Sequence, residues 1–372
     1  MIASTAFKEF HILYYNQSEQ AKQAQFGNPC RAFSLFLQEY YFQAKGECRL
    51  KKRVLVLYLI CLVCFAAVGC MRSTARQAVD EKAANAVPKL PEDIAVVDGV
   101  PQISVYSVES ESIETMDLET YVQGVLAGEM RNDWPEEALK AQAILARTFV
   151  LNFISEKDSR YAGADISTDI GEAQAYDASN INERIRDAVK QTEGFVMVYD
   201  GRFPYAWFHA HAGGITELPT AALEYKKADP PYTQVIESPD SEQAPENVQH
   251  WSASFTADEV AEACAETGVK TGKVTSLEIG KQGDSGRAIT FIVNGKEVSA
   301  PALRLRLGGT QFKSTLLESI EVKGDTITFS GRGYGHGVGM SQWGAYGMAE
   351  EGANAQEIVQ HYFKGVSIEK LY

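Results

Sequence analysis

A glutamate on the apolar face of a predicted helix is the first candidate for chemistry in this sequence. A helix is expected from about Leu118 to Met130, with Asp117 as its N-cap. Its apolar stripe passes through Val122 and Val125, and four residues further along the stripe lies Glu129. Burial disfavours a charged carboxylate and raises its pKa, which is the property a general acid requires near neutral pH. The alternative is a helix that ends before Glu129 and leaves this side chain in solvent.

A second, longer helix is expected from about Pro135 to Phe153, and two long polar side chains stand among its alanines and larger apolar residues. They belong to Gln142 and Arg147. An arginine near Glu129 could bind a substrate or stabilise the acid after it has released its proton. The alternative is an arginine on the exposed surface of a well-formed helix.

Two histidines lie at the end of a predicted strand over residues 203–211. In a strand alternate residues share one face, which places His209 and His211 beside Tyr205 and Trp207. Aromatic rings in a row could stack on the faces of sugars, and two histidines at this spacing could bind a metal ion. The alternative is an ordinary buried strand face.

A glycine occupies every second position from 331 to 339. The run matches neither GxGxxG nor a P-loop, since no Gly-Lys-Ser/Thr follows it. Such glycines let a backbone approach a ligand closely, and Tyr334 and His336 would project from the same face. Ser341 and Gln342 follow with groups that can bind sugar hydroxyls. The alternative is a glycine-rich bulge used for packing.

Four stretches of this chain resemble the SpoIID/LytB family of bacterial cell-wall proteins. The stretches YVQGVLAGEM (residues 121–130) and PEEALKAQAILART (residues 135–148) resemble one family signature, and GHGVGMSQWGA (residues 335–345) resembles its most diagnostic motif. FHAHAGGITE (residues 208–217) resembles a further segment, in which His209 matches and His211 does not. The resemblance covers about residues 100–372.

The resemblance implies a lytic transglycosylase that cuts peptidoglycan glycan strands, with Glu129 as its acid and Arg147 in its site. In this reaction the 6-hydroxyl of N-acetylmuramic acid (MurNAc) attacks its own anomeric carbon, so one carboxyl group suffices where glycosidases usually need two. The expected substrate-binding residues are Arg147, Gln142, His209, Tyr334, His336, Ser341 and Gln342. The expected substrate is a strand already stripped of its stem peptides, and an expected partner is a cell-wall amidase.

Two other functions remain open. LytB-like relatives are described as amidase enhancers, which bind or regulate without catalysis. A zinc amidase using His209, His211 and His336 is the second. Some relatives bind zinc near His209 through cysteines, but this chain has none in that region, so we expect no metal and no cofactor.

The hydrophobic pattern changes period several times, which predicts a mixed α+β fold with antiparallel hairpins beside the two helices. Hairpins are expected around Asp200-Gly201, Asn294-Gly295 and Gly324-Asp325. Asp133 and Glu136 have the spacing of a capping box at the start of the second helix. Another such pair, Asn354 and Glu357, starts a last helix that stops before Gly365.

The net charge and the positions of the cysteines exclude some classes of protein. The chain of 372 residues has a net charge of −14, and the part after residue 70 carries −18. A domain with this much negative charge binds nucleic acid poorly, because phosphate contacts need a basic surface. Five of the six cysteines lie at or before residue 70, so no disulfide framework is expected in the folded part, and Cys264 is expected in its core.

A basic cluster before an apolar run indicates export across a membrane. Residues 49–53 (RLKKR) precede an apolar segment that ends at Cys70, within a predicted signal or anchor segment over 50–70. Either Cys70 is lipidated, as in a lipoprotein, or the segment stays as an anchor helix. Both place the following residues on the extracytoplasmic face of the cell membrane. Residues 1–49 do not fit this pattern and are expected to be a wrongly assigned start, residues 71–93 a linker, and residues 94–372 the folded domain.

Overall fold

The structure is a computed structural model that describes residues 87–92 and 94–372 of the chain. The predicted prefix, the segment 50–70 with Cys70, and most of the predicted linker lie outside the described residues. Within the described part, no helix is both long and apolar enough to cross a membrane. Helices and mainly antiparallel strands surround two hydrophobic cores, which confirms the predicted α+β class.

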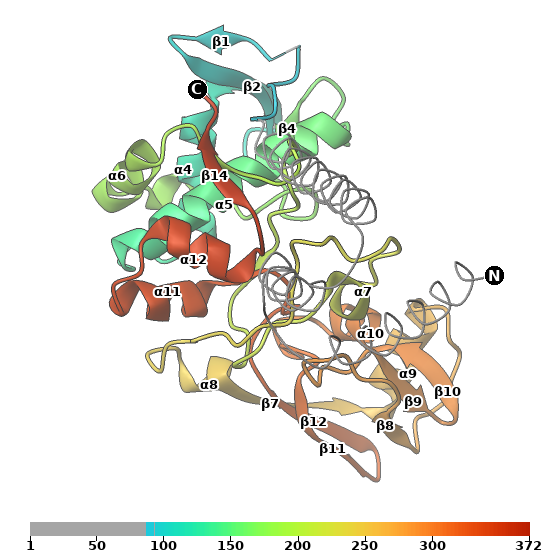
Figure 1. The fold of residues 1–372 in the computed structure, drawn as a ribbon. Coiled ribbons are helices and arrows are strands. Elements are labelled where there is room, and N and C mark those ends of the chain that lie inside the picture. Colours follow the sequence, from blue (N-terminus) through green and yellow to red (C-terminus); the bar gives the residue numbers. More distant parts are fainter. Residues whose placement is uncertain (1–86, 93) are drawn as a thin grey trace, which may run out of the picture. The chain divides into compact units, whose positions relative to one another are not determined.

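The first core is built from two stretches of the chain that flank the second core in sequence (Figure 1). Its helices are α4 (Leu118–Glu129), α5 (Glu136–Glu156), α6 (Glu183–Gln191), α11 (Gln342–Glu350) and α12 (Ala355–Tyr362). Its strands are β1 (Val96–Val97), β2 (Val100–Ser107), β3 (Ser112–Asp117), β4 (Ile166–Ser167), β5 (Phe195–Val198), β6 (Phe208–His209), β13 (Met340–Ser341) and β14 (Ser367–Lys370). The C-terminal stretch therefore packs into the same core as the N-terminal stretch.

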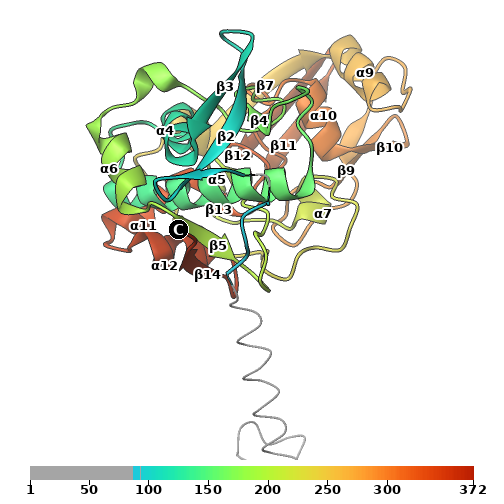
Figure 2. The ribbon, with the colours of Figure 1, turned by 90° about the horizontal axis from the view of Figure 1, so that it is seen from above.

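Helix α5 is the centre of the first core. Seen from above, it runs between α4 and β2 on one side and α11 and α12 on the other (Figure 2). Its residues are buried on nearly every face, as expected for a helix surrounded by other elements. The many alanines of this helix allow the neighbouring helices to approach closely, as predicted.

The second core lies within residues 251–329. One sheet has the order β11-β12-β7 and another the order β10-β9-β8, with α9 and α10 packed against them. The elements are β7 (His250–Thr256), α9 (Ala257–Glu266), β8 (Leu277–Ile279), β9 (Thr290–Val293), β10 (Lys296–Ser299), α10 (Ala300–Arg306), β11 (Leu317–Lys323) and β12 (Thr326–Arg332). Cys264 is fully buried here, as predicted. Short helices complete the described chain: η1 (Ala178–Asn180), α7 (Pro219–Ala222) and α8 (Glu246–Gln249).

Two of the three predicted hairpins are confirmed, and the third is wrong. Strands β9 and β10 pair around Asn294-Gly295, where both residues adopt the positive φ angles of a tight turn. Strands β11 and β12 pair around Gly324-Asp325, where Gly324 has a positive φ angle. At Asp200-Gly201 the turn forms, but β5 pairs with β14 instead of with the residues after the turn. The predicted strand 203–211 shrinks to β6, which pairs in parallel with β13.

The predicted helix caps are confirmed for α4 and α12, and the cap predicted for α5 is wrong. The Asp117 carboxylate accepts from the Thr120 N–H at 2.8 Å, and Asn354 forms the predicted capping box. The box predicted at Asp133 is wrong, because this carboxylate pairs with Arg131 at 2.7 Å. Pro135 caps α5 without a side-chain hydrogen bond.

Candidate active site

Glu129 is the last residue of α4, and its carboxyl group is partly buried against a loop that follows α5. Its Oε1 accepts a hydrogen bond from the backbone N–H of Ala175 at 2.7 Å. Burial raises the pKa of the Glu129 carboxyl to about 7, and the Ala175 N–H, which favours the charged form, opposes part of this rise. The helix thus reaches Glu129 and shields it from water, as predicted. Its catalytic role stays a prediction.

Two glycines of α4 let this loop approach the acid. A Cβ on Gly124 would lie 2.2 Å from a ring carbon of Tyr176, and one on Gly128 would lie 2.7 Å from the Ala175 carbonyl carbon. The Asp177 N–H also donates to the Gly124 carbonyl at 2.9 Å. The spacing of the two glycines therefore places the loop directly over one face of the helix, where its amide meets Glu129.

We expect Gly128→Ala to displace this loop. The added Cβ would press on backbone atoms of Ala175 and Tyr176, which cannot rotate away as the end of a side chain can. Overpacking of this kind costs about 1–3 kcal/mol. Urea unfolding should show the loss of stability, and product assays should show reduced turnover as the Ala175 hydrogen bond lengthens. Unchanged unfolding and turnover would mean that the loop moves freely.

Gln342, the first residue of α11, is the predicted binding residue that the structure brings to Glu129. Its Nε2 donates to the Glu129 backbone carbonyl at 3.1 Å. The start of α11 is positioned by β13, which pairs with β6, and by the Trp343 N–H, which donates to the Ala210 carbonyl at 3.0 Å. Residues more than two hundred positions apart in the sequence thus meet at the end of α4.

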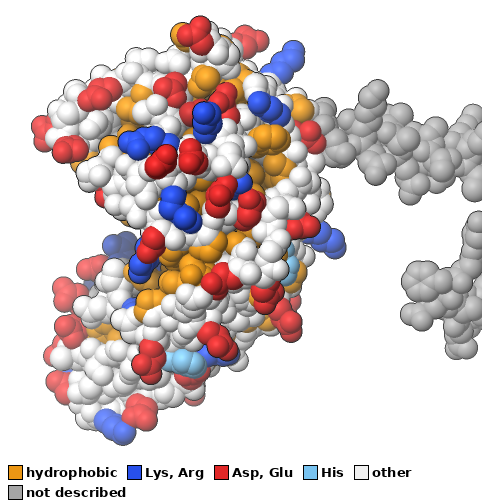
Figure 3. Space-filling model, turned by 90° about the vertical axis from the view of Figure 1, so that its left-hand side faces the viewer, with side chains coloured by type: hydrophobic (Ala, Val, Ile, Leu, Met, Phe, Trp, Pro, Cys, Tyr) orange, Lys and Arg blue, Asp and Glu red, His pale blue; other side chains and the backbone are white. Residues whose placement is uncertain are grey.

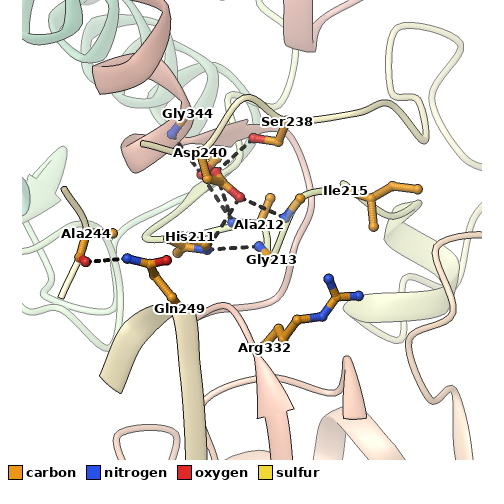
Figure 4. Close-up of polar contacts among 12 residues, drawn as sticks. His211, Ala212, Gly213, Ile215, Ser238, Asp240, Ala244, Gln249, Arg332 and Gly344 are labelled. Atoms are coloured by element: carbon orange, nitrogen blue, oxygen red, sulfur yellow. Dashed lines mark hydrogen bonds and ion pairs between the residues drawn. The ribbon is translucent and has the colours of Figure 1, made fainter. Parts of the chain in front are cut away.

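A buried aspartate that the sequence analysis missed organises the loops behind α11 (Figure 4). Asp240 accepts hydrogen bonds from the hydroxyls of Ser341 at 2.6 Å and Ser238 at 2.9 Å, and from the Gly214 N–H at 2.9 Å. Ser341 is fully buried and also caps α11 by accepting from the Gly344 N–H. Its hydroxyl therefore serves the fold, and the prediction that it contacts a sugar is corrected.

His209 and His336 lie side by side, with ring centroids 5.5 Å apart. Burial lowers the pKa of both rings, and together with the nearby Arg304 and Arg287 guanidinium groups it lowers that of His336 to about 3. Both rings are therefore neutral at physiological pH. The His209 Nδ1–H donates to the Val338 carbonyl at 3.1 Å, which ties the ring to the glycine run.

The glycine run packs against the protein's own atoms. A Cβ on Gly337 would lie 2.4 Å from the guanidinium carbon of Arg287, and one on Gly339 would lie 2.1 Å from the Trp207 carbonyl oxygen. Arg287 is fully buried and donates to the Ile215 and Ala212 carbonyls. These contacts match the packing alternative for the run. A side chain at either position would push the run off Arg287 or off the strand that carries His209.

His211 and Tyr334 are joined through their backbones by two hydrogen bonds of 2.9 Å. The His211 Nδ1 lies 3.4 Å from an Asp240 oxygen and accepts from the Gly213 N–H at 2.9 Å. Tyr334 is partly exposed, with the Lys313 ammonium 5.6 Å from its ring centre. Among residues 87–92 and 94–372, no three His, Cys, Asp or Glu side chains gather as a metal site would require.

The structure corrects the expected place of Arg147. Its guanidinium is fully buried and forms a two-pronged ion pair with Glu119, with N–O distances of 2.8 and 2.6 Å. Glu119 lies ten residues before Glu129, about 15 Å along the helix axis. Arg147 therefore cannot contact a sugar at Glu129. Gln142 is also fully buried, so its side chain is closed off from a substrate in solution. No described residue forms a hydrogen bond with this side chain.

Comparison with protein families matches two parts of the chain. Residues 106–199, which include α4 and α5, match the stage II sporulation protein (SpoIID) family. Residues 213–339, which include the second core and the whole glycine run, match a domain of unknown function (DUF8618). Glu129 thus lies in the first match, and Gln342 lies just beyond the second.

Curated relatives extend the similarity over most of the chain. Stage II sporulation protein D of Bacillus subtilis (strain 168) is 33% identical over 289 residues, covering 72% of this chain and 78% of the relative. The protein of the same name from Bacillus amyloliquefaciens is 32% identical over 280 residues, with the same coverage. An amidase enhancer of Bacillus subtilis is 28% identical over 295 residues, covering 66% of this chain and 40% of the relative.

Proposed function

This chain belongs to the stage II sporulation protein (SpoIID) family, and on that premise we propose that it is a peptidoglycan lytic transglycosylase. It would cut the bond between MurNAc and N-acetylglucosamine (GlcNAc) in glycan strands, as part of cell-wall remodelling that includes sporulation. The observation that carries the proposal is the Glu129 carboxyl, whose burial raises its pKa to about 7. Such a group is partly protonated at neutral pH and ionises readily, so it can both give and take a proton.

The proposed reaction uses Glu129 twice. Its proton passes to the glycosidic oxygen as the bond to the MurNAc anomeric carbon breaks. The carboxylate then accepts the proton of the MurNAc 6-hydroxyl, whose oxygen bonds to the same carbon and closes the anhydro ring. The Ala175 N–H holds Oε1, so we assign the transferred proton to Oε2. Gln342 positions the acid through its backbone carbonyl, and Tyr334 and His336 remain the proposed contacts for sugar groups.

The test is to identify the product of the purified protein. We would incubate residues 71–372 with peptide-free strands and with intact peptidoglycan, and analyse the soluble fragments by mass spectrometry. Anhydro-muramyl ends, more abundant from peptide-free strands and unaffected by chelators, are the expected result. Reducing ends formed with uptake of water would contradict the transglycosylase mechanism.

The amidase enhancer relative supports a second candidate function. In that case the chain would bind the cell wall and an N-acetylmuramoyl-L-alanine amidase without cutting glycan itself. The similarity is lower and covers less than half of that relative. Binding to strands without cleavage, together with faster cleavage by an added amidase, would favour this function over the first.

The pH dependence of kcat/KM should follow Glu129. The free enzyme must enter the reaction with this carboxyl protonated, so kcat/KM should be level below about pH 7 and fall about tenfold per pH unit above it. His209 and His336 should add no step between pH 6 and 8, because the pKa values of both rings lie well below that range. Initial rates at low substrate from pH 5 to 9 measure the profile. A rate that rises through pH 7 would contradict an acid role.

The location of the protein follows from the same proposal. A peptidoglycan enzyme acts outside the cytoplasm, which agrees with the predicted export segment and with attachment to the cell membrane, through lipid on Cys70 or through an anchor helix. Labelling with a radioactive fatty acid, compared between the wild type and Cys70→Ala, distinguishes the two forms of attachment.

A further inference from the structure

Three aromatic side chains pack together immediately beyond the end of α4. The ring centroids of Trp134 and Trp343 are 4.5 Å apart, those of Trp134 and Tyr346 are 5.2 Å apart, and those of Trp343 and Tyr346 are 5.1 Å apart. Trp134 is only 6% exposed and forms the floor of the cluster. Trp343 and Tyr346, one helical turn apart on α11, are partly exposed above it.

This cluster is tied to the acid through both of its chain segments. Trp134 lies five residues after Glu129 in the loop between α4 and α5. Trp343 directly follows Gln342, whose amide holds the Glu129 carbonyl at 3.1 Å. The exposed rings therefore lie on a helix whose first residue is hydrogen-bonded to the end of α4 at Glu129.

The rings are held in fixed orientations. Tyr346 meets the Trp134 ring edge-on at 83°, and its hydroxyl donates to the Gln243 side-chain oxygen at 3.0 Å. Gln243 is held in turn by Glu350, which accepts from its amide at 2.6 Å. The polar end of the tyrosine is thus satisfied within the protein, and its ring needs no ordering when a ligand arrives.

The surface around α11 is hollowed. Figure 3 shows the face of the molecule that carries this helix, and hydrophobic side chains gather there in a hollow bordered by acidic and basic ones. Partly exposed aromatic rings bordered by charges are typical of binding sites for ligands with both apolar and polar faces. Sugar rings are such ligands, since their C–H bonds form apolar faces and their hydroxyls lie at the edges.

We propose that Trp343 and Tyr346 form a stacking subsite for a sugar ring of the glycan strand, adjacent to the ring whose glycosidic oxygen Glu129 protonates. The inference rests on the proposed function, because the ligand is the same strand. The inference gives α11 a role in binding the glycan strand, in addition to the contact of Gln342 with Glu129. A strand held on these rings enters the site in one register, which places alternate MurNAc and GlcNAc units consistently relative to the acid.

The experiment replaces each ring by a side chain of similar apolar character. Trp343→Leu and Tyr346→Leu preserve much of the contact with Trp134 but remove the aromatic faces. In full-length protein carrying Glu129→Gln, which binds without turnover, each should weaken binding of peptide-free glycan fragments about tenfold. In the active enzyme each should raise KM with kcat little changed, as expected for uniform binding.

Tyr225→Leu is the matched control. Tyr225 is also partly exposed and packs edge-on against Trp207 and Tyr205, in a separate aromatic cluster. It should leave binding and KM unchanged, and circular dichroism would show that all three variants are folded. If one leucine variant does not fold, the other still tests the subsite.

The outcomes separate the subsite from the proposed function. Cleavage by the parent with unchanged affinity and KM in the leucine variants would overturn the subsite and leave the transglycosylase proposal standing. Equal losses in the leucine variants and in Tyr225→Leu would also overturn it, because the effect would not be local. A parent that neither binds nor cuts glycan would overturn both.

Discussion

Glu129→Gln should remove nearly all formation of anhydro-muramyl product and lower kcat/KM by about 10²- to 10⁴-fold. The amide keeps the size of the glutamate, and its oxygen can still accept the Ala175 N–H. It has no proton to give to the glycosidic oxygen and no charge with which to take one from the 6-hydroxyl. Both halves of the proposed reaction are lost together, so time courses of product formation from peptide-free strands should show the full effect.

Glu136→Gln is the control for this change. It removes the same charge seven residues away, from the exposed first turn of α5, where Glu136 pairs with Lys140. It should leave turnover within a small factor of the wild type. Wild-type turnover by Glu129→Gln would exclude Glu129 as the acid and leave the amidase enhancer function as the better explanation of the fold.

The fold of Glu129→Gln can be checked through its stability. The folded wild type holds the Glu129 proton up to about pH 7, whereas the unfolded chain releases it near 4.5, so wild-type stability falls as pH rises between these values. Glutamine does not ionise and escapes this loss. The variant should therefore be at least as stable as the wild type at pH 8, so an inactive but more stable protein would indicate a purely chemical defect.

The parts of the fold that the sequence predicted depend on local chemistry. Asp117 caps α4 because its carboxylate reaches an N–H three residues away, and Asn294-Gly295 turns the chain because these two residues tolerate positive φ angles. The position of Glu129 followed from the helical period of the preceding apolar residues. Each of these signals lies within a few residues of the feature that it specifies.

The parts that the sequence did not predict depend on partners far along the chain. β5 looks like half of a hairpin, but its partner is β14, more than 160 residues later. Asp240 gave no signal, because its role depends on Ser341 and on the backbone of Gly214, which only the fold brings to it. The same holds for the amide of Ala175, since no side-chain pattern marks a backbone donor aimed at Glu129.

Arg147 shows how a resemblance can find an important residue and misplace its role. Its match to the family signature led to an expected contact with substrate, yet the side chain is sealed inside the first core. It donates to Glu119 with two nitrogens and to the Phe195 carbonyl with a third, at 2.8 Å. Glu119 also accepts from the Gly194 N–H and the Tyr372 hydroxyl. The pair thus joins α4, α5, the start of β5 and the C-terminus.

Arg147→Ala should therefore destabilise the protein strongly. Removing one partner of a buried ion pair leaves an unpaired charge and typically costs about 3–5 kcal/mol. Arg147→Lys should lose much of the same stability, because an ammonium group cannot match the two-pronged geometry and reach the Phe195 carbonyl as well. Urea unfolding of both variants measures these changes, and a variant that fails to accumulate in folded form agrees with the upper end of the range.

The double variant Glu119→Leu/Arg147→Met separates the structural role from a role in binding. Replacing a buried ion pair by apolar side chains of similar volume is often neutral or stabilising, so the double variant should recover much of the lost stability. Because the pair lies about 15 Å along α4 from the acid, its kcat and KM per folded molecule should match the wild type. A double variant that folds well but loses affinity for glycan would instead place Arg147 in the substrate site, as the resemblance alone implied.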